Sequence, residues 1–146
     1  SKVTLEAGHI LLATGSDPVE LPFLKFDGKV VGGSTEALAY DKVPEHLIIV
    51  GAGYIGLELG SVWKRLGAKV SVVEFLPRIL PFADGEVAKK VQEMLTKQGL
   101  EFYLNTKVTG AKIHDGKATV TAEDKDGKGH TFVGDRVLVA VGRRAA

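Results

Sequence analysis

The hydrophobic pattern is clearest between residues 46 and 74, where an apolar run, a helical repeat and a second apolar run follow one another. Residues 46–50 (HLIIV) have the length and composition of a strand buried in a parallel sheet. Apolar residues then recur at helical spacing over residues 54–66, and residues 69–73 (KVSVV) again favour a strand. The pattern therefore predicts a βαβ unit, two parallel strands joined by a helix.

The predicted helix 54–66 is expected to bury one apolar stripe against the sheet. Gly67 is expected to end it as a left-handed C-cap, while Gly56 and Gly60, one turn apart, permit close packing. Trp63 is interpreted as a core residue. The expected stripe consists of Ile55, Leu59, Val62, Trp63 and Leu66.

A second helix and a run of strands follow. The helix is predicted from an N-cap at Asp84 to about Gln98, ended by Gly99. Its apolar face is expected to contain Val87, Val91, Met94 and Leu95. The predicted strands cover residues 100–104, 107–113, 117–122, a segment around 131–133, and 136–142.

The turns between these strands indicate an antiparallel meander before a last buried strand. Asp115-Gly116 is a two-residue hairpin signal. Residues 124–129 are interpreted as a hairpin tip and not a calcium loop, because Lys128 occupies a ligand position. His46 and His114 are expected to be exposed to solvent. The fold class predicted is α/β, with a central parallel sheet, helices and a three-stranded antiparallel meander.

The N-terminal third has no sustained period. Residues 3–12 are predicted to form a strand, followed by a turn at 13–16. Residues 17–43, rich in proline and glycine, are interpreted as a connecting arm with a short helix at 34–38, capped by Ser34 or Thr35. The compact domain is expected to begin near Pro44. Both ends of the chain suggest a piece of a longer protein.

A glycine turn joins the first strand of the βαβ unit to its helix. Gly51, Gly53 and Gly56 form the pattern G-x-G-x-x-G in the strand-turn-helix context that a dinucleotide fingerprint requires. Gly51 permits the tight exit from the strand, Gly53 lets a pyrophosphate approach the backbone, and Gly56 lets helix and strand pack closely. Phosphates would then meet free N–H groups at a helix N-terminus.

Glu74 ends the second strand, about 20 residues after the turn, where an acid can accept hydrogen bonds from both hydroxyls of an adenosine ribose. A 2′-phosphate would face like charge there, so NAD is favoured over NADP. Because ligands bind beyond the carboxyl ends of parallel strands, Gly51, Glu74 and Gly142 are expected to converge. Glu58 lies in the first turns of the helix. It is either an acid near the nicotinamide or a surface acid whose charge interacts favourably with the helix dipole.

Composition narrows the class of protein. The 146 residues are 45% hydrophobic and 25% charged, which is typical of one globular domain with a core. A net charge of +1 argues against nucleic acid or a membrane surface as partner. Without cysteine, the chain holds no disulfide or cysteine nucleophile, and no stretch has the pattern of a membrane span. A cytoplasmic location, or a matrix-like one, is expected.

Five segments closely resemble the dihydrolipoamide dehydrogenases, FAD-dependent members of the pyridine nucleotide-disulfide oxidoreductase family. They are residues 51–63 (GAGYIGLELGSVW), 65–68 (RLGA), 73–76 (VEFL), 105–110 (NTKVTG) and 140–144 (AVGRR). The resemblance covers nearly the whole chain. It implies a Rossmann-like FAD/NAD(P)-binding fold, with residues 1–43 ending a flavin domain and forming an arm, and residues 44–146 forming the NAD-binding domain.

The resemblance also implies site residues. Contacts with NAD are expected from Gly51, Ala52, Gly53, Tyr54, Ile55, Gly56, Leu57, Glu58, Glu74, Val108 and Gly142. Contacts with FAD in the parent protein are expected from Thr14, Gly15 and Ser16. The family's redox cysteines and its catalytic histidine and glutamate lie outside these residues, so the chain alone is expected to bind NAD without turnover and without retaining FAD.

The resemblance implies further that the parent is a homodimer that oxidises dihydrolipoamide on the lipoyl domains of 2-oxo acid dehydrogenase complexes. In a eukaryote its location would be the mitochondrial matrix. Two alternatives remain open: the NAD(P) domain of a related disulfide or mercuric reductase, and a non-catalytic nucleotide-binding module.

Overall fold

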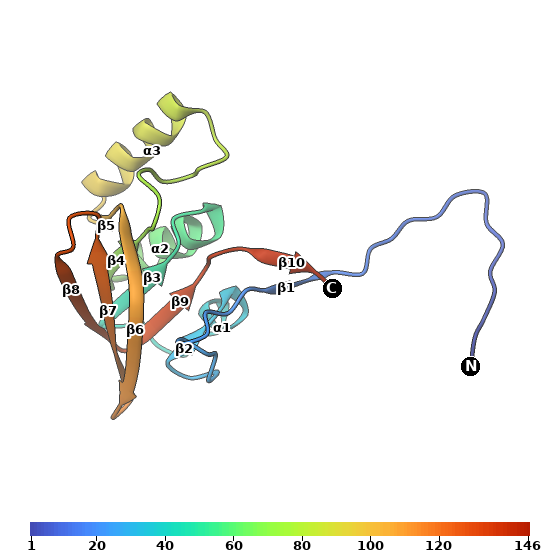
Figure 1. Cartoon of the computed structure of the whole chain (residues 1–146), viewed down its shortest axis with the longest axis horizontal. Coiled ribbons are helices and arrows are strands. Elements are labelled where there is room, and N and C mark those ends of the chain that lie inside the picture. The colour runs from blue at the N-terminus through green and yellow to red at the C-terminus, as the bar shows by residue number, and fades with distance from the viewer.

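The computed structural model describes residues 1–146 and has a parallel sheet at its centre (Figure 1). The strand order is β2-β9-β3-β4-β5, and all neighbouring pairs are parallel. The bounds are β2 Val31–Gly32, β9 Arg136–Val139, β3 His46–Val50, β4 Lys69–Val73 and β5 Glu101–Tyr103. The predicted βαβ unit is confirmed as β3, α2 (Tyr54–Leu66) and β4.

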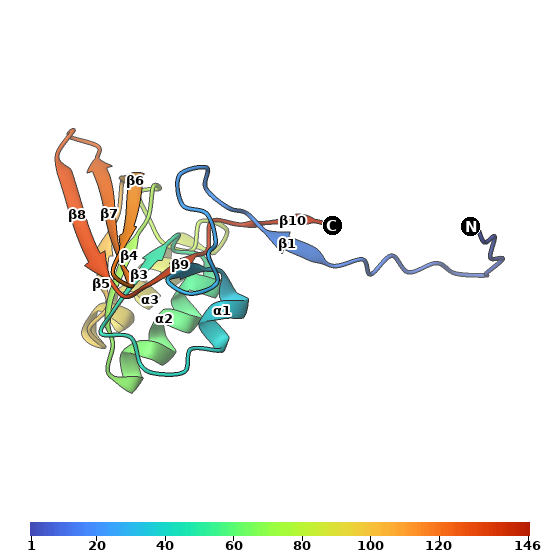
Figure 2. The same cartoon turned by 90° about the horizontal axis from the view of Figure 1, so that it is seen from below.

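The molecule has three layers, seen edge-on in Figure 2. Helices α1 (Ser34–Leu38), α2 and α3 (Gly85–Lys97) cover one face of the parallel sheet, and an antiparallel sheet covers the other. The second sheet has the order β6-β7-β8, formed by Thr106–His114, Lys117–Asp124 and Gly129–Gly134. The predicted Rossmann-like α/β fold with its three-stranded meander is therefore confirmed.

Alternate side chains of β3 enter different cores. Leu47 and Ile49 pack with the helices, whereas Ile48 and Val50 pack with the antiparallel sheet. All four are buried. This explains why the run is apolar without alternation: both faces of the strand are covered.

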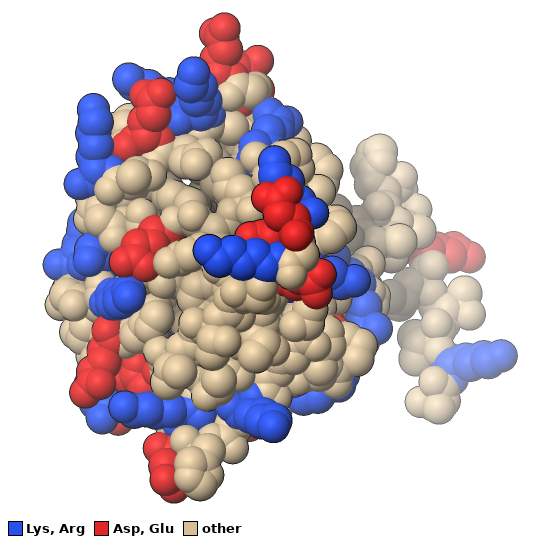
Figure 3. Space-filling model, turned by 60° about the vertical axis from the view of Figure 1, so that its left-hand side comes forward, with Lys and Arg blue, Asp and Glu red and all other residues tan.

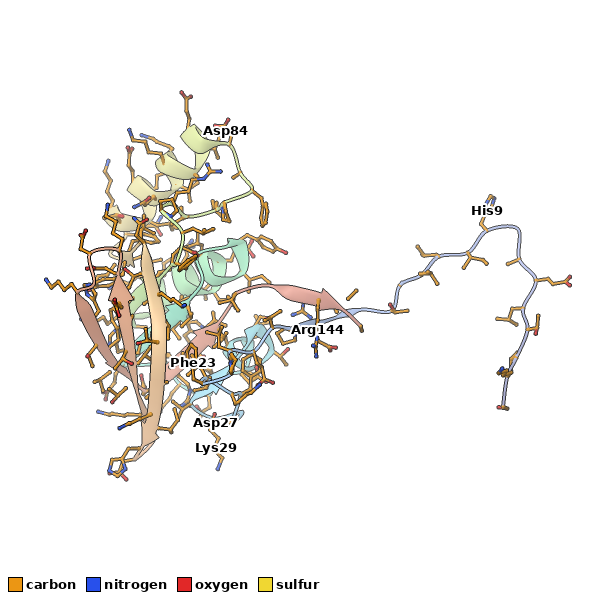
Figure 4. All side chains as sticks on the ribbon, viewed as in Figure 1. His9, Phe23, Asp27, Lys29, Asp84 and Arg144 are labelled. Atoms are coloured by element: carbon orange, nitrogen blue, oxygen red, sulfur yellow. The ribbon has the colours of Figure 1, made fainter.

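The predicted turns and helix ends hold. Asp115 and Gly116 adopt positive φ between β6 and β7, as a two-residue hairpin loop requires. Gly67 ends α2 in the left-handed conformation. Asp84, labelled in Figure 4, caps α3 by accepting hydrogen bonds from the N–H groups of Glu86 and Val87. None of the helices is both long and apolar enough to span a bilayer.

The prediction for residues 3–12 was wrong. They form no strand, and their side chains are exposed along an extension that carries His9 away from the domain (Figure 4). A strand needs a neighbour to pair with its backbone, and this stretch has none in the chain. Farther along the chain, β1 (Ser16–Pro18) pairs with β10 (Arg143–Ala145) in a separate two-stranded ribbon.

The short helix at residues 34–38 is confirmed, but its cap was misassigned. Gly33 is the N-cap, and its N–H donates to the Glu36 carboxylate at 2.7 Å. The preceding arm also contributes more than a connection: β2 joins the edge of the parallel sheet, and Leu24 and Val31 are buried in the core. The division at residue 43 stays a prediction.

The apolar stripes predicted for the helices were only partly right. In α2, Val62 and Leu66 are exposed, and the buried residues are Gly56, Leu57, Gly60 and Ser61. The helix axis lies close to the sheet, so only small residues fit between helix and sheet. A repeat of large apolar residues does not identify such positions. In α3, Val87 and Met94 are exposed, and Ala88, Val91 and Leu95 make the core contacts.

Two further side-chain placements are informative. Trp63 packs against the helical core as predicted and donates a hydrogen bond to the Ala37 carbonyl. His46 was expected to be solvated but bridges two strands: Nδ1 lies 2.7 Å from the Val133 carbonyl and Nε2 lies 2.9 Å from Ser71 Oγ. His114 is exposed at the hairpin.

The face in Figure 3 carries interspersed charges of both signs.

Candidate dinucleotide-binding site

A cleft of about 880 Å³ lies beyond the carboxyl ends of β3, β4 and β9. These three strands are adjacent in the sheet, so the segments that follow them meet there. Glu74, Lys107 and Arg143 are the charged residues among those lining it. The full lining is Leu21, Phe23, Val50, Gly51, Gly53, Tyr54, Ile55, Val73, Glu74, Phe75, Leu76, Pro81, Phe82, Thr106, Lys107, Val108, Ala140, Val141, Gly142 and Arg143.

Gly51 makes the exit from β3 possible. Its φ is +104°, and a Cβ at this position would collide with the carbonyl of Ala140, which follows β9. Its N–H donates to the Val73 carbonyl at 2.9 Å. The turn is therefore wedged between the two neighbouring strands, and only glycine meets both the conformational and the steric demand.

Gly53 is the N-cap of α2 and faces open space. A Cβ there would meet no atom within 4 Å, and no side chain caps the helix. The first hydrogen bond of the helix runs from the Leu57 N–H to the Gly53 carbonyl, so the N–H groups of Tyr54 and Ile55 have no partner within the helix. The cleft thus contains unpaired donors and a bare backbone, as a pyrophosphate requires.

Gly56 holds helix and strand together. A Cβ on it would lie 2.6 Å from the Gly51 carbonyl oxygen and 3.0 Å from Ile49 Cγ2. Gly60, one turn later, is similarly close to Ile49 Cδ1. The packing role predicted for both glycines is confirmed.

Glu74 is 8% exposed, and its carboxylate lies against the glycine turn. Oε2 accepts a hydrogen bond of 2.6 Å from the Ala52 N–H, and Oε1 accepts one of 2.9 Å from the Leu76 N–H. A carboxylate has about four acceptor positions, so two remain for hydroxyl donors. The residues present therefore fit a dinucleotide: donors for its phosphates, and a fixed acceptor for a ribose.

A family profile described as pyridine nucleotide-disulphide oxidoreductase matches residues 1–146. The chain belongs to this family. The chain is 52% identical over 144 residues to the mitochondrial dihydrolipoyl dehydrogenase of Dictyostelium discoideum, covering 97% of the chain and 30% of that protein. It is 48% identical over 145 residues to dihydrolipoyl dehydrogenase 3 of Pseudomonas putida, covering 99% and 31%.

Solved structures of flavoprotein disulfide reductases share the fold of this chain. The HOCl-induced flavoprotein disulfide reductase RclA from Escherichia coli matches with a TM-score of 0.75 and 31% identity, over 91% of this chain and 30% of that one. LpdA from Mycobacterium tuberculosis matches with a TM-score of 0.75 and 28% identity, over 89% and 28%. The chain spans about 30% of the length of the relatives it matches.

The cleft brings together most, but not all, of the residues predicted to contact NAD. Those lining it are Gly51, Gly53, Tyr54, Ile55, Glu74, Val108 and Gly142. Ala52, Gly56 and Leu57 are buried and do not line it, and Glu58 is exposed outside the lining. Thr14, Gly15 and Ser16 also lie outside it, at the start of the β1-β10 ribbon, where Arg143 donates to the Ser16 hydroxyl.

The sequence reasoning missed two parts of the cleft lining: Leu21 and Phe23 of the arm, and the loop between β4 and α3. Phe75, Pro81 and Phe82 line the cleft from this loop. The Leu80 N–H donates to the Ala52 carbonyl at 2.9 Å, which fixes the loop against the glycine turn. The available signal was the pair of phenylalanines in this loop, because ligand sites are lined mainly by hydrophobic and aromatic side chains.

Proposed function

We propose that the chain is the NAD(H)-binding domain of a dihydrolipoyl dehydrogenase, the flavoprotein that oxidises dihydrolipoamide with NAD⁺. The observation that carries the proposal is the cleft, in which the glycine turn and the Glu74 carboxylate face the same space. The identity to dihydrolipoyl dehydrogenases of two distant organisms supports the same enzyme class.

Different residues of the chain would bind different parts of the dinucleotide. The N–H groups of Tyr54 and Ile55 would hold the pyrophosphate at the start of α2, with Gly53 leaving room for it. Glu74 would accept from the adenosine ribose. Val108 and Gly142 would line the two ends of the cofactor, and Glu58 would lie near its nicotinamide.

The redox chemistry belongs to the rest of the parent. The chain has no cysteine, so the disulfide that takes electrons from dihydrolipoamide must come from elsewhere. FAD, when bound in the parent, would pass electrons between that disulfide and NAD⁺. Residues 1–43 would end the flavin domain and cross from it, with Thr14, Gly15 and Ser16 touching FAD, and residues 44–146 would form the NAD domain. The isolated chain would bind NAD(H) without turnover.

The same proposal implies an oligomeric state, a partner and a cellular location for the parent. The parent would be a homodimer acting on lipoyl domains of a 2-oxo acid dehydrogenase complex, in the cytoplasm or in the mitochondrial matrix of a eukaryote. A second candidate is the NAD(P) domain of a related disulfide reductase, which the likeness to the RclA structure favours. A buried Glu74 beside the cleft argues for NAD over NADP, because a 2′-phosphate would meet its negative charge.

Titration of the purified chain with NADH and NADPH tests the proposal. Energy transfer from Trp63, the single tryptophan, to the reduced nicotinamide reports binding. We expect saturable binding of NADH and at least about tenfold weaker binding of NADPH, since one unfavourable charge contact costs about 1.4 kcal/mol or more. A preference for NADPH would favour the second candidate, and no binding of either at millimolar concentration would favour a non-catalytic module.

A further inference from the structure

Phe82 is fully exposed, with a relative exposure of 103%, although it belongs to a well-fixed loop. Ile79, three residues before Phe82, is completely buried, and the Leu80 N–H donates a hydrogen bond to the Ala52 carbonyl in the glycine turn. Arg78 donates to the Pro81 carbonyl at 2.6 Å, and the Ala83 N–H donates to the Leu80 carbonyl. A loop anchored on both sides of Phe82 therefore holds a phenyl ring in water, which the packing of the core does not explain.

The ring lines the same cleft as the glycine turn and Glu74. In the sheet, β4 and β9 lie on opposite sides of β3, so the ends of these strands mark opposite ends of the cleft. If Glu74, at the end of β4, holds the adenosine ribose, the base would extend away from β9 and toward the β4-α3 loop. Phe75, 66% exposed on that loop, lines the cleft there as well.

From these placements we propose that Phe82 is the residue that covers the purine base of the bound dinucleotide. The inference rests on the proposed function and adds a residue that determines affinity for the base. A planar base buries apolar surface against an exposed phenyl ring, and stacking of a base on an aromatic side chain contributes about 1–3 kcal/mol. Binding would remove from water both the base and a side chain that is otherwise exposed.

Three ligands separate the base from the rest of the cofactor: NADH, ADP-ribose and reduced nicotinamide mononucleotide, which has no adenine. We expect Phe82→Ala to weaken NADH and ADP-ribose about tenfold in calorimetric titrations and to leave the mononucleotide unchanged. Phe82→Tyr is expected to keep the affinity. Val133→Ala, which truncates an exposed apolar side chain on β8 outside the cleft, is the matched control and is expected to change no affinity.

The outcomes distinguish this inference from the proposed function. If the unaltered chain binds ADP-ribose and Phe82→Ala binds it equally well, Phe82 does not cover the base. An equal loss for the mononucleotide would also overturn the inference. Failure of the unaltered chain to bind ADP-ribose would overturn the proposed function and this inference together. Equal melting temperatures of Phe82→Ala and the unaltered chain would show that the fold is intact.

Discussion

The backbone N–H of Ala52 donates a hydrogen bond of 2.6 Å to Oε2 of Glu74, so that one carboxylate joins the glycine turn to the end of β4. The other oxygen accepts from the Leu76 N–H. Glu74 is thus fixed before any ligand arrives, and the proposed ribose acceptor loses little entropy on binding. The same contacts give Glu74 a structural role in addition to its proposed role in binding.

Replacement of Glu74 by arginine is expected to change both cofactor preference and stability. The Ala52 and Leu76 N–H groups lose their acceptor, which should lower the free energy of unfolding by about 1–3 kcal/mol. A cation beside the ribose should move the ratio of NADPH to NADH affinity toward NADPH. Urea unfolding and parallel titrations measure the two effects.

Glu123→Arg is the control for this change of charge, because Glu123 is exposed on β7 outside the cleft. It should alter neither stability nor cofactor ratio by more than the error of the titration. If Glu74→Arg leaves the ratio of affinities unchanged, the ribose is not held at this carboxylate.

Tyr40→Phe is expected to leave stability unchanged or to raise it by about 1 kcal/mol. The Tyr40 hydroxyl is buried without a hydrogen-bond partner, while the ring packs against Trp63 at a centroid distance of 5.3 Å. Phenylalanine keeps the ring contacts and removes the orphaned hydroxyl. Tyr54→Phe, at an exposed position, is the control for stability. A clear destabilisation by Tyr40→Phe in urea unfolding would mean that the hydroxyl has a partner in solution.

The same tyrosine should make stability depend on alkaline pH. Burial raises the pKa of Tyr40 from 10.0 to about 12. The folded state holds the proton more tightly than the unfolded state, so this contribution to the free energy of unfolding is intact below pH 10 and declines as the pH rises toward 12. Tyr40→Phe should flatten this part of the stability profile. If the free energy of unfolding of Tyr40→Phe declines with alkaline pH as steeply as that of the unaltered chain, the decline does not come from Tyr40.

Asp27 is expected to contribute stability that is lost in acid. Burial acts to raise the pKa of its carboxyl, but the N–H groups of Lys29, Val31 and Val30 donate to Oδ1, and these bonds lower the pKa below 3.8 overall. The contribution is therefore present above pH 3.8 and is lost as the pH falls through the folded-state value. Figure 4 shows Asp27 and Lys29 on the turn that leads into β2.

Urea unfolding at pH values from neutral to about 3 tests this expectation. Asp27→Asn should be less stable at neutral pH and should lose less on acidification. Asp126→Asn, an exposed aspartate on the β7-β8 turn, removes the same charge as a control. Parallel acid profiles for the unaltered chain and Asp27→Asn would contradict the role of the carboxylate.

The elements that the sequence predicts well are those whose signals are local. β3, α2 and β4 follow from two apolar runs and a helical repeat, and the α3 cap and the β6-β7 hairpin follow from Asp84 and from Asp115-Gly116. The meeting of Gly51, Glu74 and Gly142 at one cleft also follows, because the carboxyl ends of parallel strands share one edge.

The features that were missed depend on contacts distant in the sequence. The pairing of β2 with β9 and of β1 with β10 joins residues more than a hundred positions apart, and no local pattern specifies it. Residues 3–12 have the composition of a strand, but composition does not supply a partner. The cleft wall containing Phe82 depends on the hydrogen bond between Leu80 and Ala52, which follows only from the fold.

Gly51 and Gly53 belong to one turn, and substitutions should separate their roles. Gly53→Val is expected to abolish NADH binding with little loss of stability, because φ of −79° suits any residue and the new side chain would enter open space where the pyrophosphate is proposed to lie. Gly51→Ala should instead destabilise the fold by about 2 kcal/mol or more, through its positive φ and a collision with the Ala140 carbonyl. Melting curves and NADH titrations of both variants are the measurements. NADH affinity that survives Gly53→Val would place the dinucleotide elsewhere on the chain.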